Sequence, residues 1–229
     1  MIYGLETILT FGLAIIAFII VISAQAYLSS TYKKGKEKEN NNGLSGCEIA
    51  RKILDSNGLD DVYVVLTSGM LSDHYDPKRK VVRLSKDIFH GTTVAATAVA
   101  AHECGHAIQD KENYIFMRIR AFLVPLVNFM TYIGYFGLVV SIFAGITGYL
   151  KISIALIAIS LLFQLITLPV EFDASKRALK EINRLSLTTK DEKELSSQVL
   201  KAAALTYVAS LISTVIDLLR LVIMLNDRE

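Results

Sequence analysis

Long stretches without a charged residue constrain this chain more than any other feature. No Asp, Glu, Lys or Arg occurs over residues 7–32, 121–150 or 152–170. About 20 apolar residues are enough for a helix to cross a bilayer. A fourth apolar stretch begins near Ala202 and is interrupted by Asp217 and Arg220, which lie three apart on a helix and can pair with each other. The chain is therefore predicted to be a mainly α membrane protein with about four transmembrane helices.

The first stretch has an alternative interpretation as a signal peptide, because Ala24-Gln25-Ala26 has the form of a small-residue cleavage site. Two features oppose it. Residues 1–6 carry no positive charge, and the apolar run is longer than a typical signal core. We therefore expect an uncleaved membrane anchor.

The positions of lysine and arginine predict the orientation in the membrane, because these residues gather in cytoplasmic loops. They are frequent in residues 33–38 and 176–201, and Arg118 and Arg120 precede the second apolar stretch. The short connection at residues 145–151 offers only Lys151. The chain is thus expected to be a multi-pass protein of the cell membrane whose residues 33–120 and 171–201 face the cytoplasm.

This orientation divides the chain into four parts. They are an anchor at 1–32, a cytoplasmic α+β part at 33–120, a transmembrane hairpin at 121–170, and a cytoplasmic segment with a C-terminal transmembrane helix at 171–229. The lipid bilayer is one expected partner. The net charge of only +2 gives no basis for a nucleic-acid partner, and the oligomeric state stays open.

Within the cytoplasmic part, the pattern of apolar residues predicts short elements. Residues 33–46 are charged and rich in Asn and Gly, which is typical of a mobile linker. A helix is expected over 47–57 and strands over 62–67 and 80–85, the second with Val82 and Leu84 on one face. Asp76-Pro77 indicates a turn, and small helix-forming residues follow from Thr92.

The expected helix after Thr92 carries His-Glu-Cys-Gly-His at residues 102–106. Side chains four apart lie on one face of a helix, so His102 and His106 can both bind one zinc ion. Glu103, the next residue around the helix, can act as general base on a zinc-bound water without being a ligand. Cys104 lies between the histidines and is expected to be a small buried residue.

A catalytic zinc site needs a third protein ligand, and Glu171 is the strongest candidate. It is the first charged residue after an uncharged span. Two crossings fit between His106 and Glu171, and an even number of crossings returns the chain to the face of the bilayer that it left. The hairpin would therefore deliver Glu171 to the side of the motif helix.

The remaining candidates have weaker arguments. His74 is expected in a surface turn, with substrate binding as the alternative, and His90 is expected to be structural. Asp173 and Asp110 are both eligible to accept a hydrogen bond from a ligating histidine, because such histidines usually donate their other ring N–H to a carboxylate or carbonyl. The residue pattern does not choose between these two aspartates.

Four segments resemble the YugP-like family of neutral zinc metallopeptidases, which are bacterial membrane proteins. They are SDHYDP (72–77), VVRLS (81–85), AVAAHECGHAIQ (98–109) and LPVEFDASKRAL (168–179). More distantly, the layout is similar to membrane gluzincins of the HtpX and CAAX-processing type. That resemblance implies a zincin-like cytoplasmic part with one Zn²⁺ on His102, His106 and Glu171, and Glu103 as the base. Those relatives place an aspartate four residues after the ligand glutamate, where this chain has Ser175.

The expected function is hydrolysis of peptide bonds in peptides or membrane proteins near the cytoplasmic membrane surface. A strand edge near Val81 to Leu84 is a possible holder of extended substrate. Two alternatives remain open at this point. One is a non-catalytic scaffold with structural zinc, in which Cys104 would matter more. The other is a protease that cuts inside the hydrocarbon, with the motif helix at membrane depth.

Overall fold

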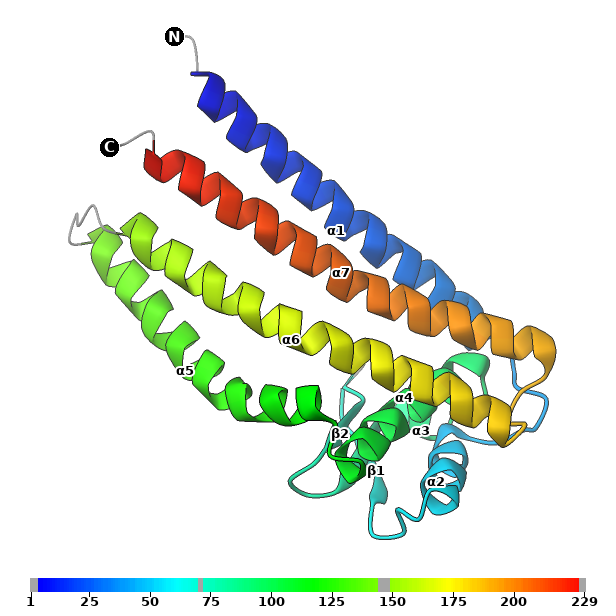
Figure 1. The fold of residues 1–229 in the computed structure, drawn as a ribbon. Coiled ribbons are helices and arrows are strands. Elements are labelled where there is room, and N and C mark those ends of the chain that lie inside the picture. Colours follow the sequence, from blue (N-terminus) through cyan, green and yellow to red (C-terminus); the bar gives the residue numbers. More distant parts are fainter. Residues whose placement is uncertain (1–3, 70–71, 144–148, 227–229) are drawn as a thin grey trace. The chain divides into compact units, whose positions relative to one another are not determined.

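A computed structural model describes residues 4–69, 72–143 and 149–226 of the chain. The elements follow in the order α1 (Leu5–Glu37), α2 (Gly46–Ser56), β1 (Tyr63–Thr67), β2 (His74–Asp76), β3 (Val81–Ser85), α3 (Lys86–Phe89), α4 (Val94–Lys111), α5 (Ile115–Phe143), α6 (Tyr149–Arg184) and α7 (Lys190–Asn226) (Figure 1). The chain forms two compact units. The first comprises the described parts of 1–25, 119–168 and 206–229, and the second comprises 26–118 and 169–205.

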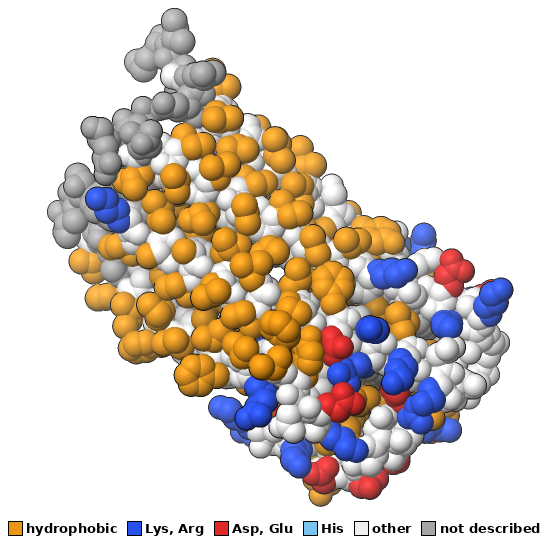
Figure 2. All heavy atoms as spheres, in the orientation of Figure 1, with side chains coloured by type: hydrophobic (Ala, Val, Ile, Leu, Met, Phe, Trp, Pro, Cys, Tyr) orange, Lys and Arg blue, Asp and Glu red, His pale blue; other side chains and the backbone are white. Residues whose placement is uncertain are grey.

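The first unit consists of long apolar helices. By length and composition, four described helical segments are able to cross a membrane: Thr7–Glu37, Ile115–Gly134, Lys151–Arg184 and Lys190–Leu225. Their apolar side chains face outward (Figure 2), and on α5 Phe122, Tyr132 and Phe136 are 76%, 77% and 73% exposed. The prediction of a mainly helical chain with four candidate spans is confirmed. Most of the expected hairpin turn, residues 144–148, lies outside the described residues.

A few polar contacts join helices within this unit. Gln164 Nε2 on α6 donates to Thr214 Oγ1 on α7 over 2.9 Å. Arg220 on α7 donates from Nε to the Thr10 carbonyl of α1 over 2.9 Å, and from Nη1 to Asp217 over 2.7 Å. The predicted pairing of Asp217 with Arg220 is therefore confirmed.

The second unit contains a three-stranded sheet of order β1-β3-β2, in which β1 runs parallel and β2 antiparallel to β3. Val82 and Leu84 of β3 are fully buried, as their alternation predicts. The predicted turn at Asp76-Pro77 closes the β2–β3 hairpin, where Asp76 Oδ1 accepts from the backbone N–H groups of Lys78 and Arg79. The prediction of a free edge on β3 is wrong, because the unforeseen strand β2 makes β3 central.

Helix α2 covers the core with the face that its sequence predicts. Ser45 and Glu48 form a reciprocal capping box at its start. Ile49, Ile53 and Leu54 are fully buried in the same cluster as the alanines of α4.

The prediction of a mobile linker at 33–46 is wrong. Helix α1 continues through Glu37, and the next residues bond to the segment before α4. The Lys38 carbonyl accepts from Val94 N over 2.9 Å, and Asn40 N donates to the Thr92 carbonyl over 2.7 Å. The buried Asn40 amide also donates to the Leu44 carbonyl over 2.8 Å. Asparagine amides thus satisfy backbone groups that regular structure leaves unpaired.

Candidate metal centre

Helix α4 carries the His-Glu-x-x-His motif through the core of the second unit. It starts at Thr93, whose side chain accepts from Ala96 N over 3.2 Å as an N-cap. Small side chains let this helix be enclosed by its neighbours. Its fully buried alanines are Ala95, Ala96, Ala98, Ala100, Ala101 and Ala107.

Gly105 allows α6 to approach α4 closely at the motif. A Cβ atom placed on Gly105 would lie 2.5 Å from the carbonyl oxygen of Ala174, which is closer than real Cβ atoms come to other atoms. Only glycine therefore fits at this position without a backbone shift. Since Ala174 lies three residues after Glu171, the same contact brings Glu171 over the motif histidines.

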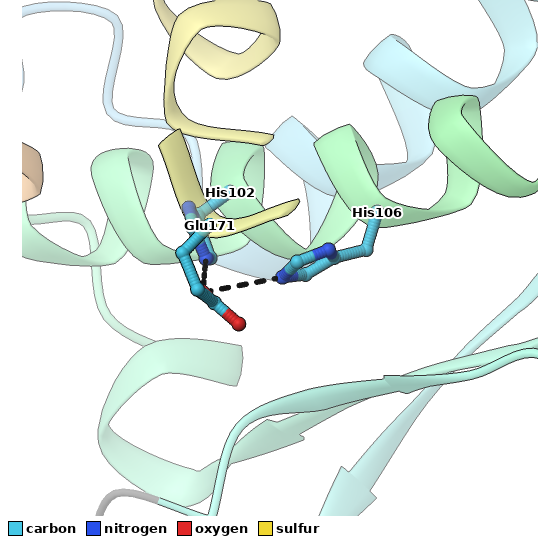
Figure 3. Close-up of side chains that lie close together, drawn as sticks. All are labelled: His102, His106 and Glu171. Atoms are coloured by element: carbon cyan, nitrogen blue, oxygen red, sulfur yellow. Dashed lines mark hydrogen bonds and ion pairs between the residues drawn. The ribbon is translucent and has the colours of Figure 1, made fainter. Parts of the chain in front are cut away.

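The side chains of His102, His106 and Glu171 converge, as Figure 3 shows. Glu171 Oε2 lies 3.3 Å from His102 Nε2 and 3.7 Å from His106 Nε2. One potential ligand atom from each residue lies within 4.8 Å of the others. The Glu171 and His106 side chains are 4% and 10% exposed, and that of His102 is 16% exposed. The structure thus brings together the three residues that the sequence nominates.

These distances fit the ligand atoms of a metal ion. Tetrahedral zinc with bonds of about 2.0–2.1 Å separates its ligand atoms by roughly 3.3 Å. Charge-assisted hydrogen bonds between N–H and a carboxylate are usually shorter, about 2.7–2.9 Å. Two imidazole nitrogens and one carboxylate oxygen are also a donor set typical of catalytic zinc. The residues present therefore fit a zinc ion.

Gln109 orients His106. Its Nε2 donates to the Val170 carbonyl over 2.8 Å and to Asp173 Oδ2 over 2.9 Å. Its Oε1 must then accept from His106 Nδ1, 2.9 Å away. With the proton on Nδ1, the lone pair of a neutral His106 lies on Nε2, which faces Glu171. Two acceptor atoms that face each other need a cation or a proton between them.

Ser175 is the corresponding partner of His102, with its hydroxyl oxygen 3.2 Å from Nδ1. It occupies the position, four residues after Glu171, where the more distant relatives have aspartate. A hydroxyl oxygen can accept a hydrogen bond from Nδ1–H, as a carboxylate would. The residue pattern predicts neither Ser175 nor Gln109 as a partner of a histidine, because both are neutral and the expected partners are carboxylates. Helical spacing indicates Gln109, three residues after His106 on the same helix, but not the contact of Ser175 with His102 on another helix.

Asp173 and Asp110, the two candidate partners of the histidines, bond to other residues. Asp173 accepts from Gln109 and Arg177, so it supports His106 only through the glutamine. Asp110 accepts a hydrogen bond of 2.9 Å from the Tyr75 hydroxyl, and burial together with Asp110 raises the pKa of Tyr75. Neither aspartate is bonded directly to His102 or His106 in the part of the chain that the structure describes.

The two other histidines lie outside the cluster. His74 is exposed in β2, with Nδ1 2.7 Å from the Ser72 carbonyl. His90 is exposed at the end of α3, with its ring edge-on to that of Phe89. Within the described ranges, the group of side chains that could hold a metal includes neither of them.

The carboxylates of Glu171 and Glu103 change the pKa of His106. Burial lowers its pKa, but contact with the Glu171 carboxylate and the nearby charge of Glu103 outweigh burial and raise the pKa above its ordinary value. In the metal-free protein, the raised pKa favours a proton on Nε2 next to the Glu171 carboxylate. A metal ion and this proton compete for the same atom.

Glu103 and Cys104 differ in what surrounds them. Glu103 is 7% exposed, and no described side chain or backbone group engages its carboxylate in a hydrogen bond or ion pair. Cys104 is fully buried, with its sulfur 3.6 Å from the Ala50 carbonyl on α2. Burial raises the pKa of its thiol well above the ordinary value, which favours the protonated thiol in the metal-free protein. Among the described residues, the group that could hold a metal does not include Cys104.

Comparisons with known proteins give the family of the chain. The model of a family described as "Putative neutral zinc metallopeptidase" matches residues 10–226. The chain is 42% identical over 207 residues to "Putative membrane protease YugP" of Bacillus subtilis (strain 168), with 90% of this chain and 92% of that protein covered. No solved structure gives a significant match.

Proposed function

The chain belongs to this family of neutral zinc metallopeptidases, and from that premise we propose that it is a zinc-dependent endopeptidase bound to the membrane. His102, His106 and Glu171 would hold one zinc ion. The observation that carries the proposal is the spacing of 3.3 and 3.7 Å between the Glu171 oxygen and the two histidine nitrogens.

Each residue of the site would have a distinct task. Zinc, when bound, supplies a Lewis acid that polarises the scissile carbonyl and lowers the pKa of a coordinated water. Glu103 would accept the proton of the attacking water and deliver it to the leaving amine. Its lack of a partner among the described residues supports this role, since a carboxylate held in an ion pair is a weaker base. Gln109 and Ser175 would hold the two imidazoles with Nε2 toward the metal.

The substrates would be membrane proteins or peptides close to the cytoplasmic surface. The uncharged part of α6 ends at Val170, and Glu171 follows it directly. Four described helical segments qualify as spans, and α4 is not one of them. Both observations favour cleavage beside the bilayer over cleavage inside the hydrocarbon. The cytoplasmic orientation itself is inferred from the distribution of lysine and arginine.

A comparison of Glu103→Gln with the wild type tests the proposal. We expect the purified variant to retain one zinc per chain and to cleave fluorescein-labelled casein at least about 100-fold more slowly, because general acid–base catalysis contributes a factor of roughly 10²–10⁴. Glu194→Gln, at an exposed position of α7, is the matched control and should behave as the wild type.

Two results would contradict the proposal. Equal cleavage by Glu103→Gln and the wild type would show that Glu103 is not the general base and would favour a scaffold with structural zinc. Absence of zinc from the purified wild-type protein would show that the three residues do not form a zinc site. Labelling of a cysteine introduced at Lys111, an exposed position at the end of α4, with a water-soluble reagent tests the intramembrane alternative, which predicts protection by lipid.

A further inference from the structure

Helices α6 and α7 enclose a groove in the second unit, next to the metal centre. Its volume is about 410 Å³, within the range of roughly 300–1,000 Å³ for small-molecule sites. Most of the wall is apolar and includes Phe172, Leu179, Leu200 and Leu205. Phe172 and Leu205 are each 47% exposed, so the groove presents an apolar surface that the described chain leaves uncovered.

Two lysines, Lys176 and Lys201, complete the wall of this groove. Both are exposed, and within the described ranges neither ammonium group makes an ion pair or hydrogen bond. Two free positive charges beside an apolar channel are complementary to a ligand with an anionic head and a hydrocarbon tail. A purely apolar peptide would leave both charges unused, and a small inorganic anion would leave the apolar wall exposed.

The sequence places both lysines just beyond the apolar stretches of their helices. Lys176 follows the last uncharged residue of the α6 span, Val170, by six residues, which is about 9 Å along a helix. Lys201 directly precedes Ala202, where the apolar stretch of α7 begins. The headgroup layer adds roughly 5–8 Å on each side of the hydrocarbon, and lysine side chains reach toward it. Lipid phosphates lie at this depth.

We infer that the groove binds an anionic phospholipid, with its phosphate between Lys176 and Lys201 and an acyl chain along the apolar wall. Basic pockets between helices at the membrane surface are a known form of lipid recognition. Ser175 lines the same groove and contacts His102 Nδ1. A bound lipid would therefore touch a residue that positions a proposed zinc ligand. The inference concerns lipid binding and does not depend on peptidase activity.

Native mass spectrometry of the full chain tests the inference. The protein is reconstituted in vesicles of phosphatidylcholine mixed with phosphatidylglycerol and released in mild detergent, and the lipids that remain bound are identified by mass. We expect the wild type to retain phosphatidylglycerol in preference to phosphatidylcholine. Lys176→Gln/Lys201→Gln should bind phosphatidylglycerol about 30-fold more weakly, since each lysine near a membrane surface is worth a factor of roughly five.

The matched control is Lys180→Gln/Lys190→Gln, which removes two exposed lysines from the same helices outside the groove. It should bind phosphatidylglycerol as the wild type does. Thermal unfolding in detergent reports folding in every variant. If the first double variant does not fold, Lys176→Arg/Lys201→Arg must retain the lipid and Lys201→Gln alone must bind it about five-fold more weakly.

The hydrocarbon part of the ligand has its own test. Leu205→Gln, at an exposed position of the wall, should weaken phosphatidylglycerol binding with both lysines present. Inorganic phosphate should not displace the lipid. Displacement by phosphate, equal retention of phosphatidylcholine, unchanged binding by Lys176→Gln/Lys201→Gln, or a bound peptide or second chain in place of lipid would each overturn the inference.

Discussion

Gln109 and Gln164 lie in different units of the chain, and their side-chain amides bond to different kinds of group. Gln109 is fully buried on α4 and bonds to His106, to the Val170 carbonyl and to Asp173. Gln164 is partly buried on α6, and its amide bonds to Ser160 on the same helix and to Thr214 on α7. One amide therefore orients a proposed metal ligand, whereas the other joins two long apolar helices.

The contrast shows how each unit uses its polar groups. In the second unit, every hydrogen-bonding group of the Gln109 amide is engaged, so the His106 ring has one orientation. In the first unit, the helices are long and apolar enough to cross a bilayer. Polar contacts between these helices add little stability. Substitutions near the motif should therefore change metal binding strongly, and similar substitutions among the apolar helices should not.

The largest effect is expected for Glu171→Ala. Removal of a ligand leaves two imidazoles, and zinc affinity should fall by more than about 100-fold, since even the outer partners of ligands account for roughly 10–100-fold. Competition with a zinc chelator measures the loss. Glu181→Ala, a buried carboxylate of α6 bonded to Arg184 and Asn57, is the control. Unchanged zinc affinity in Glu171→Ala would remove the proposed third ligand.

Gly105→Ala should destabilise the protein, because the added Cβ would lie 2.5 Å from the backbone oxygen of Ala174. Overpacking of this kind costs about 1–3 kcal/mol, and displacement of α6 should also weaken zinc binding. Thermal unfolding in detergent measures the first effect. Gly12→Ala on α1 is the matched control, since nothing lies within 4 Å of the corresponding Cβ. Equal stability of the two variants would refute the close approach of α4 and α6.

Periodicity and charge predict much of this architecture, because they report which faces are buried. The four apolar stretches, the α2 face and the alternation in β3 follow directly from them. Helical spacing nominates His102 and His106, and the parity of membrane crossings nominates Glu171. Composition predicts a mobile segment at 33–46 because it does not show that the backbone groups of these residues pair with Thr92 and Val94 at the start of α4. The partner Ser175 depends on a side-chain contact between α6 and α4, which a linear pattern does not define, whereas Gln109 follows His106 by three residues on the same helix.

Gln109→Leu should lower zinc affinity by about 10–100-fold, as expected when a ligating histidine loses the group that orients it. The substitution removes the acceptor of His106 Nδ1 and leaves the Val170 carbonyl without its donor. Ser175→Ala removes the single longer contact with His102, and its effect should be smaller. Chelator competition measures both variants. A larger loss in Ser175→Ala than in Gln109→Leu would reverse the assigned ranking of the two partners.

Zinc affinity should rise with pH, by up to about tenfold per pH unit, until pH passes the raised pKa of His106. Binding expels the proton from Nε2, and above that pKa the proton is already gone. The metal-free protein should behave in the opposite way. Its stabilisation by protonated His106 is complete below the unfolded pKa of about 6.5 and is lost as pH rises through the folded value. Chelator competition across this range measures the profile, and a flat profile would contradict it.

Gln164→Leu should have the smallest effect, because the contact with Thr214 joins helices whose apolar faces already define their position. Interhelical hydrogen bonds in membrane proteins contribute about 0.6 kcal/mol on average, and leucine adds apolar surface in return. Thermal stability in detergent and zinc affinity should both stay close to those of the wild type. Since Gln109→Leu is the same substitution, the pair compares the two units directly. Equal losses of zinc affinity in both variants would show that the Gln109 amide has no special role in orienting His106.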